Sequence, residues 1–392
     1  MKRILTALAL IMAMTAAAER PAPELIRSGH TARATLCVVG DFVIHDSLIQ
    51  SASDEAKRTG SSLDSDFSPM LELVRGRLSS ADFTVANVDG VFLGNGNKPY
   101  GGYPRFNTPP SLLCALRDAG VDMLTMANNH ALDYWYDGLK ASLDHVDDAG
   151  LMHIGAARTR EEHDMPAIVD IRGIRFGFLN YTTYLNGIDR YAGLDPDTMD
   201  FGICAESNSD FDADVLKLRA EGAEIVVCFM HWGTEYRETP DSKQLQTGKA
   251  LVHAGVDVIV GGHPHVVQRA DWLSGVNQFG AEQRTLCVYS LGNFLSGQRK
   301  SGRDGGIILE LTVEKDETGA VHVADASYTS TWVWQSGTES RGYAYRILPV
   351  AEYAQSRPSG MSSAEHYNMR LLRTMHEKAM TSGSLSLPEK DG

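Results

Sequence analysis

The chain has 392 residues, of which 43% are hydrophobic and 22% are charged, as in a globular protein with a large core. Its formal net charge is −14. A surface this acidic excludes nucleic acid and anionic bilayers as partners bound through a general basic face. An anionic ligand would have to be held by local cations, and bound metal ions are one source of them.

The N-terminus has the pattern of an export signal. Lys2 and Arg3 precede an apolar stretch at residues 4–14, and the alanines at 16–18 form a small-residue cleavage site. We expect a signal peptide over residues 1–18, and the alternative is an uncleaved signal anchor. The protein is therefore expected to be exported, periplasmic or extracellular, and membrane-associated if the signal is retained.

Five cysteines are an odd number, so at least one is unpaired. Cys37, Cys228 and Cys287 each lie inside an apolar run, where cysteine behaves as a small hydrophobic residue. The sequence contains no Cys-x-x-Cys, which argues against thiolate metal binding. We expect core thiols, although an oxidising compartment leaves a disulfide open.

From residue 33 to about 300, short apolar runs alternate with helical segments. Continuous apolar runs of this length predict strands that are covered on both faces. The predicted strands span residues 34–39, 83–87, 121–127, 174–179, 224–230, 256–260 and 285–290, and the predicted helices span 68–78, 111–119, 137–149 and 242–254. This alternation indicates an α/β fold.

Beyond residue 300, apolar and polar residues alternate. Residues 305–314 and 320–328 predict an antiparallel hairpin, and residues 343–350 predict a further strand. A loop at 351–365, an amphipathic helix at 365–380 and a loose Ser/Gly-rich end complete the chain. We expect one domain over residues 33–350, followed by a C-terminal helix and loose tail at 351–392.

Polar motifs follow most of the predicted parallel strands at the point where each strand ends. In chain order they contain Asp41, Asn87 with Asp89, Asn128-Asn129-His130, His231 with Glu235, His263-Pro264-His265, and Asn293. Ligands of open α/β sheets bind beyond the carboxyl ends of the strands, so these side chains are expected to converge. Carboxylate, amide and imidazole groups together predict a site for one or two divalent ions such as Zn, Mn, Fe or Mg.

Each motif also has a purely structural interpretation. Asp41 could cap a helix, Asn128 and Asn129 could form a turn, and His231 could be a hydrogen-bonded core histidine. The shared position of all the motifs favours the metal site, because these separate explanations would all have to hold together.

The motif series resembles that of the CapA proteins, a family tied to capsule and poly-γ-glutamate synthesis with a metallophosphatase-like fold. The resemblance runs from about residue 35 to 297 and is carried by Gly40-Asp41, Asn87-x-Asp89, Asn128-Asn129-His130-Ala131-Leu132-Asp133, His231-Trp232-Gly233-x-Glu235-Tyr236, Gly262-His263-Pro264-His265-Val266-Val267-Gln268 and Tyr289-Ser290-Leu291-Gly292-Asn293-Phe294. It implies a calcineurin-like two-sheet sandwich flanked by helices (αββα) in a protein that works at the cell envelope.

The resemblance also implies roles for individual residues. His130 would be catalytic, assisting the leaving group or the transition state, and the implied metal ligands are Asp41, Asp89, Asn129, His231, His263 and His265. Asn87, Asn128, Glu235 and Asn293 would lie around the metals or the substrate, and Arg105, in the loop at 98–110, is our candidate anion contact. The sequence departs from the phosphoesterase pattern at Val43, where a histidine is expected, with His45 nearby but out of register.

Three functions follow as hypotheses. The first is an exported metal-dependent hydrolase or transferase that acts on an anionic envelope polymer or its precursor, in association with a membrane-bound polymer synthase complex. The second is a non-catalytic accessory protein for polymer synthesis or export, which the residue at position 43 favours. The third is a generic periplasmic metallophosphoesterase.

Overall fold

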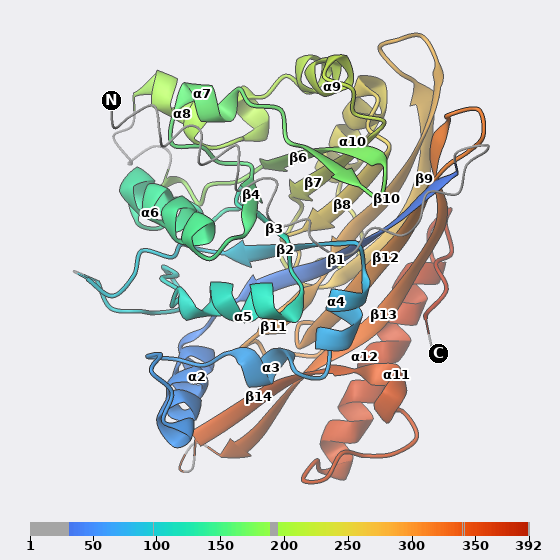
Figure 1. Ribbon diagram of the computed structural model, residues 1–392. Helices are drawn as coiled ribbons and strands as arrows, with labels where there is room; N and C mark the ends of the chain where they lie inside the picture. The colour runs from blue at the N-terminus through green and yellow to red at the C-terminus, as the bar shows by residue number, and fades with distance from the viewer. Residues whose placement is uncertain (1–30, 97, 189–194, 339, 341, 391–392) are drawn as a thin grey trace.

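The computed structural model describes residues 31–96, 98–188, 195–338, 340 and 342–390, and the expected signal peptide at 1–18 lies outside them. Two β-sheets pack face to face, and helices cover the outer face of each sheet (Figure 1). The expected two-sheet sandwich flanked by helices is therefore confirmed. A search of the described helices finds none with the length and apolar character of a membrane span.

The first sheet has the strand order β14-β13-β12-β1-β2-β3-β4, and β11 pairs with the end of β1. Strands β1 to β4 are parallel, whereas β12, β13 and β14 are antiparallel as the alternating pattern predicts. The strand bounds are β1 (Ala32–Val43), β2 (Phe83–Asp89), β3 (Met123–Thr125), β4 (Met152–Ile154), β11 (Asn293–Ser296), β12 (Gly305–Lys315), β13 (Val321–Thr338) and β14 (Gly342–Pro349).

The second sheet has the order β5-β6-β7-β8-β10-β9. Its middle strands are parallel, and an antiparallel strand closes each edge. The strand bounds are β5 (Ile168–Ile171), β6 (Ile174–Thr182), β7 (Ile225–His231), β8 (Val258–Gly262), β9 (Val267–Val276) and β10 (Glu282–Leu291).

Helices shield the two outer faces. Helices α2 to α6 contribute to the apolar layer over the first sheet, and α9 and α10 cover the second (Figure 1). The helix bounds are α2 (Asp46–Thr59), α3 (Ser68–Leu71), α4 (Arg75–Ser80), α5 (Ser111–Ala119), α6 (Trp135–Asp148), α7 (Arg160–His163), α8 (Pro196–Gly202), the 3₁₀ turn η2 (Glu206–Asn208), α9 (Phe211–Ala220), α10 (Ser242–Ala254), α11 (Val350–Tyr353) and α12 (Ser363–Thr381).

Strand β1 shows how the apolar runs form two separate cores. Because side chains alternate across a strand, Leu36 and Val38 face the second sheet while Cys37 and Val39 face the helices. Burial on both faces explains why the run is continuously apolar. All five cysteines are free thiols, and those in the apolar runs are buried as predicted.

Two predictions about the elements need correction. The single helix expected at 68–78 is divided into α3 and α4, and the break lies where Val74 turns into the core. The segment between α12 and residue 390 is not loose: Leu387 is buried in the inter-sheet core, and the Lys390 N–H donates to the Tyr328 carbonyl. The apolar side chains of this segment hold it against the sheet despite its polar composition.

Helix α12 buries an ionisable group. His376 is only 2% exposed, its Nδ1 lies 2.6 Å from the Ser330 hydroxyl, and its Nε2 has no partner among the described residues. Burial lowers the pKa of His376 from 6.5 to about 3. The imidazole is therefore neutral in the folded protein at neutral pH.

We predict that this histidine makes the protein acid-sensitive. Its contribution to stability is complete above pH 6.5 and is lost as the pH falls toward 3, because the unfolded chain binds the proton first. Between about pH 7 and pH 4.5, the free energy of unfolding of His376→Gln should fall by roughly 1–3 kcal/mol less than that of the wild type. Denaturant titrations at the two pH values measure this, with exposed His322→Gln as the control. Equal losses in the wild type and His376→Gln would contradict the prediction.

Candidate metal centre

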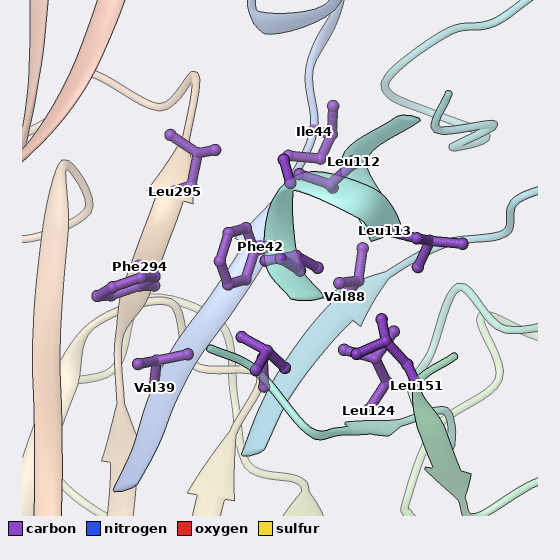
Figure 2. Packing of buried hydrophobic residues seen from close by; sticks show 14 of the residues in the cluster. Val39, Phe42, Ile44, Val88, Leu112, Leu113, Leu124, Leu151, Phe294 and Leu295 are labelled. Atoms are coloured by element: carbon purple, nitrogen blue, oxygen red, sulfur yellow. The ribbon is translucent and has the colours of Figure 1, made fainter. Parts of the chain in front are cut away.

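Two parallel strands of the first sheet bring the carboxylates together. Asp41 lies near the end of β1 and Asp89 at the end of β2, and the strand register pairs Asp41 with Asn87. Phe42, which follows Asp41, and Val88, which lies between Asn87 and Asp89, point the other way into the core beneath α5 (Figure 2). The alternation along each strand therefore presents three polar side chains on one face, which apolar anchors on the opposite face hold in place.

Asn87 links the two carboxylates. Its Nδ2 donates to Asp41 Oδ1 and to Asp89 Oδ1, each at 2.8 Å. Asp41 is 1% exposed and Asp89 is fully buried. One amide group thus fixes the separation of two buried acids.

The second sheet supplies the imidazoles. His231 ends β7, and His263 and His265 follow β8. The His263 backbone N–H donates to Asp41 Oδ2 at 2.9 Å, and His265 Nδ1 lies 3.4 Å from the same oxygen. Ligand atoms of Asp41, Asp89 and His265 all lie within 4.8 Å of one another, the spacing of a group that can hold a metal ion.

Glycines permit this approach of the two sheets. A Cβ on Gly262 would lie 2.6 Å from Asp41 Oδ1, and a Cβ on Gly40 would lie 2.1 Å from the Gly292 carbonyl oxygen. Only residues without a side chain fit at these two positions.

Backbone strain is concentrated here. Non-glycine residues with positive φ include His263 (92°), His265 (57°), Tyr236 (65°) and Asn186 (52°), all of which lie at or around the cluster. Such conformations are costly and persist where the surrounding structure imposes them, which is common at functional sites.

Burial and charge shift the pKa values of the acids in opposite directions. Burial acts to raise the pKa of Asp41, but the nearby imidazoles of His265 and His231 outweigh it and lower this pKa to about 2. Burial and the charge of Asp41 raise the pKa of Asp89 to about 7. The cluster therefore holds one strongly ionised carboxylate and one that a further positive charge would ionise.

The pKa values of the three imidazoles also shift in opposite directions. Burial and the neighbouring imidazoles lower the pKa of His231 far below 6.5 and that of His263 to about 3, so both imidazoles are neutral at neutral pH. Burial acts to lower the pKa of His265, but contact with Asp41 outweighs it and raises this pKa.

A second group of polar atoms surrounds His231. Its Nε2 lies 2.9 Å from Asn129 Oδ1 and 3.2 Å from His263 Nδ1. Asn129 Nδ2 donates to Asn186 Oδ1 at 3.1 Å, which fixes the orientation of the amide. Two imidazole nitrogens and an amide oxygen therefore converge beside the carboxylates.

His130 is held by a residue to which the sequence analysis assigned no role. Its Nδ1 lies 2.8 Å from Asp133 Oδ2, and the same oxygen accepts the Phe106 N–H at 2.7 Å. Asp133 is 1% exposed. Because a carboxylate accepts, Nδ1 carries the proton that is donated to Asp133. The spacing His130-x-x-Asp133 in the sequence could have indicated this pairing. Asn186, the partner of Asn129, lies in a loop without a motif, so no sequence pattern indicated its role.

The donor set fits a divalent ion. Asp89 Oδ2 and His265 Nδ1 are buried and have no hydrogen-bond partner among the described residues. Unsatisfied buried polar atoms are costly, so a group that accepts their lone pairs would stabilise the cluster. Carboxylate, imidazole and amide donors suit Zn, Mn or Fe.

The other predicted residues lie around this centre. Asn128 Oδ1 accepts the His130 N–H, and Asn128 Nδ2 donates to the Val88 carbonyl, so it shapes the turn. Glu235 is exposed beyond β7. Asn293 is paired with Asp41 in register, but its Nδ2 donates to the Arg303 carbonyl at 2.7 Å.

Arg105 and position 43 lie at the periphery. The Arg105 guanidinium is exposed and lies over the rings of Trp135 and Tyr134, at 5.1 and 5.9 Å. Val43 is 2% exposed and supplies no ligand. The His45 ring packs edge-on against Phe106, and its Nδ1 contacts the Val43 carbonyl.

We predict that Asp89→Asn raises the stability of the metal-free protein and abolishes its stabilisation by metal. The substitution removes one of two neighbouring buried charges, so the metal-free protein should gain roughly 1–2 kcal/mol in free energy of unfolding. The increase in melting temperature that Mn²⁺ causes in the wild type should disappear, and the exposed control Asp137→Asn should retain it. Thermal melts with and without Mn²⁺ test both expectations, and retained Mn²⁺ stabilisation in Asp89→Asn would contradict them.

Gly262→Ala should weaken metal binding through the position of Asp41. The added methyl group meets the Asp41 carboxylate, and changes in the residues that orient a metal ligand typically cost about 10–100-fold in metal affinity. Gly76→Ala, which meets no atom within 4 Å, is the matched control. Calorimetric titration with Mn²⁺ measures the difference, and equal affinities for the two variants would rule out this role of the glycine.

The sequence that contains these motifs is similar to that of known proteins. The model of the family described as bacterial capsule synthesis protein PGA_cap matches residues 35–298. The capsule biosynthesis protein CapA of Bacillus anthracis is 30% identical over 188 residues, which cover 47% of this chain and 42% of that protein. The PGA biosynthesis protein CapA of Bacillus subtilis (strain 168) is 28% identical over 217 residues, which cover 53% and 51%.

The chain thus spans about half the length of the curated relatives it matches. Among solved structures, the NAD nucleotidase NadN of Haemophilus influenzae aligns with a TM-score of 0.48 and 12% identity, covering 91% of this chain and 57% of that one. The family match extends over well more than half of this chain and contains every motif of the centre. The chain therefore belongs to the PGA_cap family of bacterial capsule synthesis proteins.

Proposed function

We propose that this protein is an exported, metal-dependent hydrolase or transferase of capsule synthesis that acts on an anionic envelope polymer, such as poly-γ-glutamate, or on its precursor. The observation that carries the proposal is the buried group of Asp41, Asp89 and His265, two of whose ligand atoms have no hydrogen-bond partner among the described residues. A polymer can be held without such a group, so its presence supports a role in chemistry.

The residues that would hold metal are Asp41, Asp89 and His265, with Asn129, His231 and His263 as a second set. A divalent ion in such a site lowers the pKa of water and polarises the bond to be cleaved. It also supplies positive charge for an anionic substrate.

His130 is positioned to move a proton. The carboxylate of Asp133 holds the Nδ1–H of His130, so Nε2 can accept a proton and then donate it to a leaving oxygen or nitrogen. The Phe106 ring, 4.7 Å away and edge-on, packs against the imidazole and restricts its rotation. When His130 is protonated, the charge of Asp133 stabilises the imidazolium.

The family and the N-terminal pattern support our proposal that the reaction takes place at the envelope. Capsule synthesis takes place at the envelope, and the pattern at residues 1–18 is that of an exported protein. A membrane-bound polymer synthase complex is the partner that we propose.

One observation favours the accessory role as a second candidate. Val43 is buried and apolar at the position where the phosphoesterase pattern has a histidine, and His45 does not belong to the Asp41–Asp89–His265 group. With one ligand fewer, the centre would bind metal for structure and hold the polymer without cleaving it.

The deciding experiment separates metal binding from turnover. We expect purified protein to contain bound metal by elemental analysis and to hydrolyse either phosphoesters or poly-γ-glutamate. His130→Ala should retain its metal and lose about 10²–10⁴-fold in rate, because it removes a proton donor and no ligand. His231→Ala should lose both, and the exposed control His322→Ala should lose neither. Bound metal without turnover of either substrate would favour the accessory role.

A further inference from the structure

An aromatic ring connects the metal centre to a cation outside it. The Tyr236 N–H donates to the Pro264 carbonyl at 2.7 Å, which ties Tyr236 to the turn between His263 and His265. The Tyr236 ring centre lies 6.0 Å from that of His265. Tyr236 is partly buried and has a φ of 65°, so its position is imposed by the surrounding structure.

Arg303 lies on this ring. Its Cζ is 3.4 Å from the centre of the Tyr236 ring. Tyr236 therefore contacts both the guanidinium of Arg303 and the ring of His265 in the metal centre. The backbone of Arg303 is fixed as well, because its carbonyl accepts from Asn293 Nδ2 and its N–H donates to the Lys300 carbonyl. The contact of Asn293 thus positions this loop beside the centre.

Within the described residues the guanidinium of Arg303 forms no ion pair, unlike that of Arg269. Across the described ranges, no carboxylate forms an ion pair with Arg303, and the adjacent Asp304 accepts from the Trp332 indole instead. Arg299, in the same loop, donates to the carbonyls of Ser296 and Val333. Arg269, also placed over a tyrosine, pairs with Asp271.

A stacked guanidinium with free N–H groups is a recognised means of binding oxyanions. Stacking on an aromatic face leaves its donors available for two parallel hydrogen bonds to a carboxylate or phosphate. Because the chain has a net charge of −14, a half-buried unpaired cation next to the centre is an unusual local feature.

We propose that Arg303, supported by Tyr236, is an anion-binding residue of this site that contacts a carboxylate or phosphate group of the substrate next to the group on which the metal centre acts. This inference rests on the proposed function for the identity of the site. It adds a recognition residue that lies outside all of the motifs.

The test is calorimetric titration of two probes, inorganic phosphate and a γ-linked glutamate trimer, into metal-free and Mn²⁺-loaded protein. Arg303→Gln should weaken the binding of at least one probe about tenfold, the effect of losing one charge-assisted contact. Arg303→Lys should weaken it less, because it keeps the charge and loses the planar fork. A loss confined to the phosphate or to the trimer identifies which oxyanion the residue recognises.

Arg284→Gln is the matched control, because Arg284 lies 4.0 Å over the Trp272 ring without an ion pair in the described chain, outside the metal-centre motifs. It should bind both probes as the wild type does. Unchanged affinity for both probes in Arg303→Gln and Arg303→Lys, or an equal loss in Arg284→Gln, would overturn the proposal.

Two further measurements keep this test independent of the proposed function. Mn²⁺ affinity and the thermal melt of Arg303→Gln should match those of the wild type, which shows that the centre and the fold are intact. Absence of turnover or of metal would refute the proposed hydrolase, whereas the difference in anion affinity between Arg303→Gln and Arg284→Gln would remain measurable in the metal-free protein.

Discussion

The contact between Asp41 and the backbone N–H of His263 joins the two sheets at the point where the site lies. Asp41 belongs to β1 of the first sheet, and His263 follows β8 of the second. A charge-assisted hydrogen bond between a buried carboxylate and a backbone donor is among the stronger contacts in a protein. The gathering of Asp41 and Asp89 from the first sheet with His265 from the second depends on the two sheets meeting at this distance.

This arrangement is unfavourable for stability. Two buried carboxylates share one amide donor, two imidazoles approach each other, and several non-glycine residues have positive φ. Buried charges without full compensation and strained backbone both cost free energy. The apolar layers on either side, which include Phe42 and Val88, offset this cost and allow the centre to keep its geometry (Figure 2).

The net charge of the whole chain and the charge of the arginines close to the site have opposite signs. The chain as a whole is acidic, which repels polyanions at long range. Beside the site, the guanidinium of Arg303 is stacked on the ring of Tyr236, and at the periphery that of Arg105 lies over the ring of Trp135. Local cations of this kind, together with bound metal, would let an acidic protein select an anionic group at one position without binding polyanions over its whole surface.

The sequence alone determined the architecture and most of the centre. Apolar runs ending in Asp, Asn or His predict parallel strands with ligands at one edge, because the carboxyl ends of parallel strands lie together. The structure brings Asp41, Asp89 and His265 within 4.8 Å of one another, and His231 contacts Asn129 and His263 beside them. Elements with a clear period, such as α5 and α10, were predicted with the observed bounds.

Only the tertiary structure decided which atoms meet. The bridging role of Asn87, the pairing of Asp133 with His130, the contact of Asn186 with Asn129 and the stacking of Arg303 on Tyr236 all join residues through side-chain orientation. The same applies to the chain end after α12, whose polar composition concealed the apolar contacts that anchor it. Local sequence determines where a strand ends, but the packing of one sheet on the other determines which side chains come within hydrogen-bonding distance.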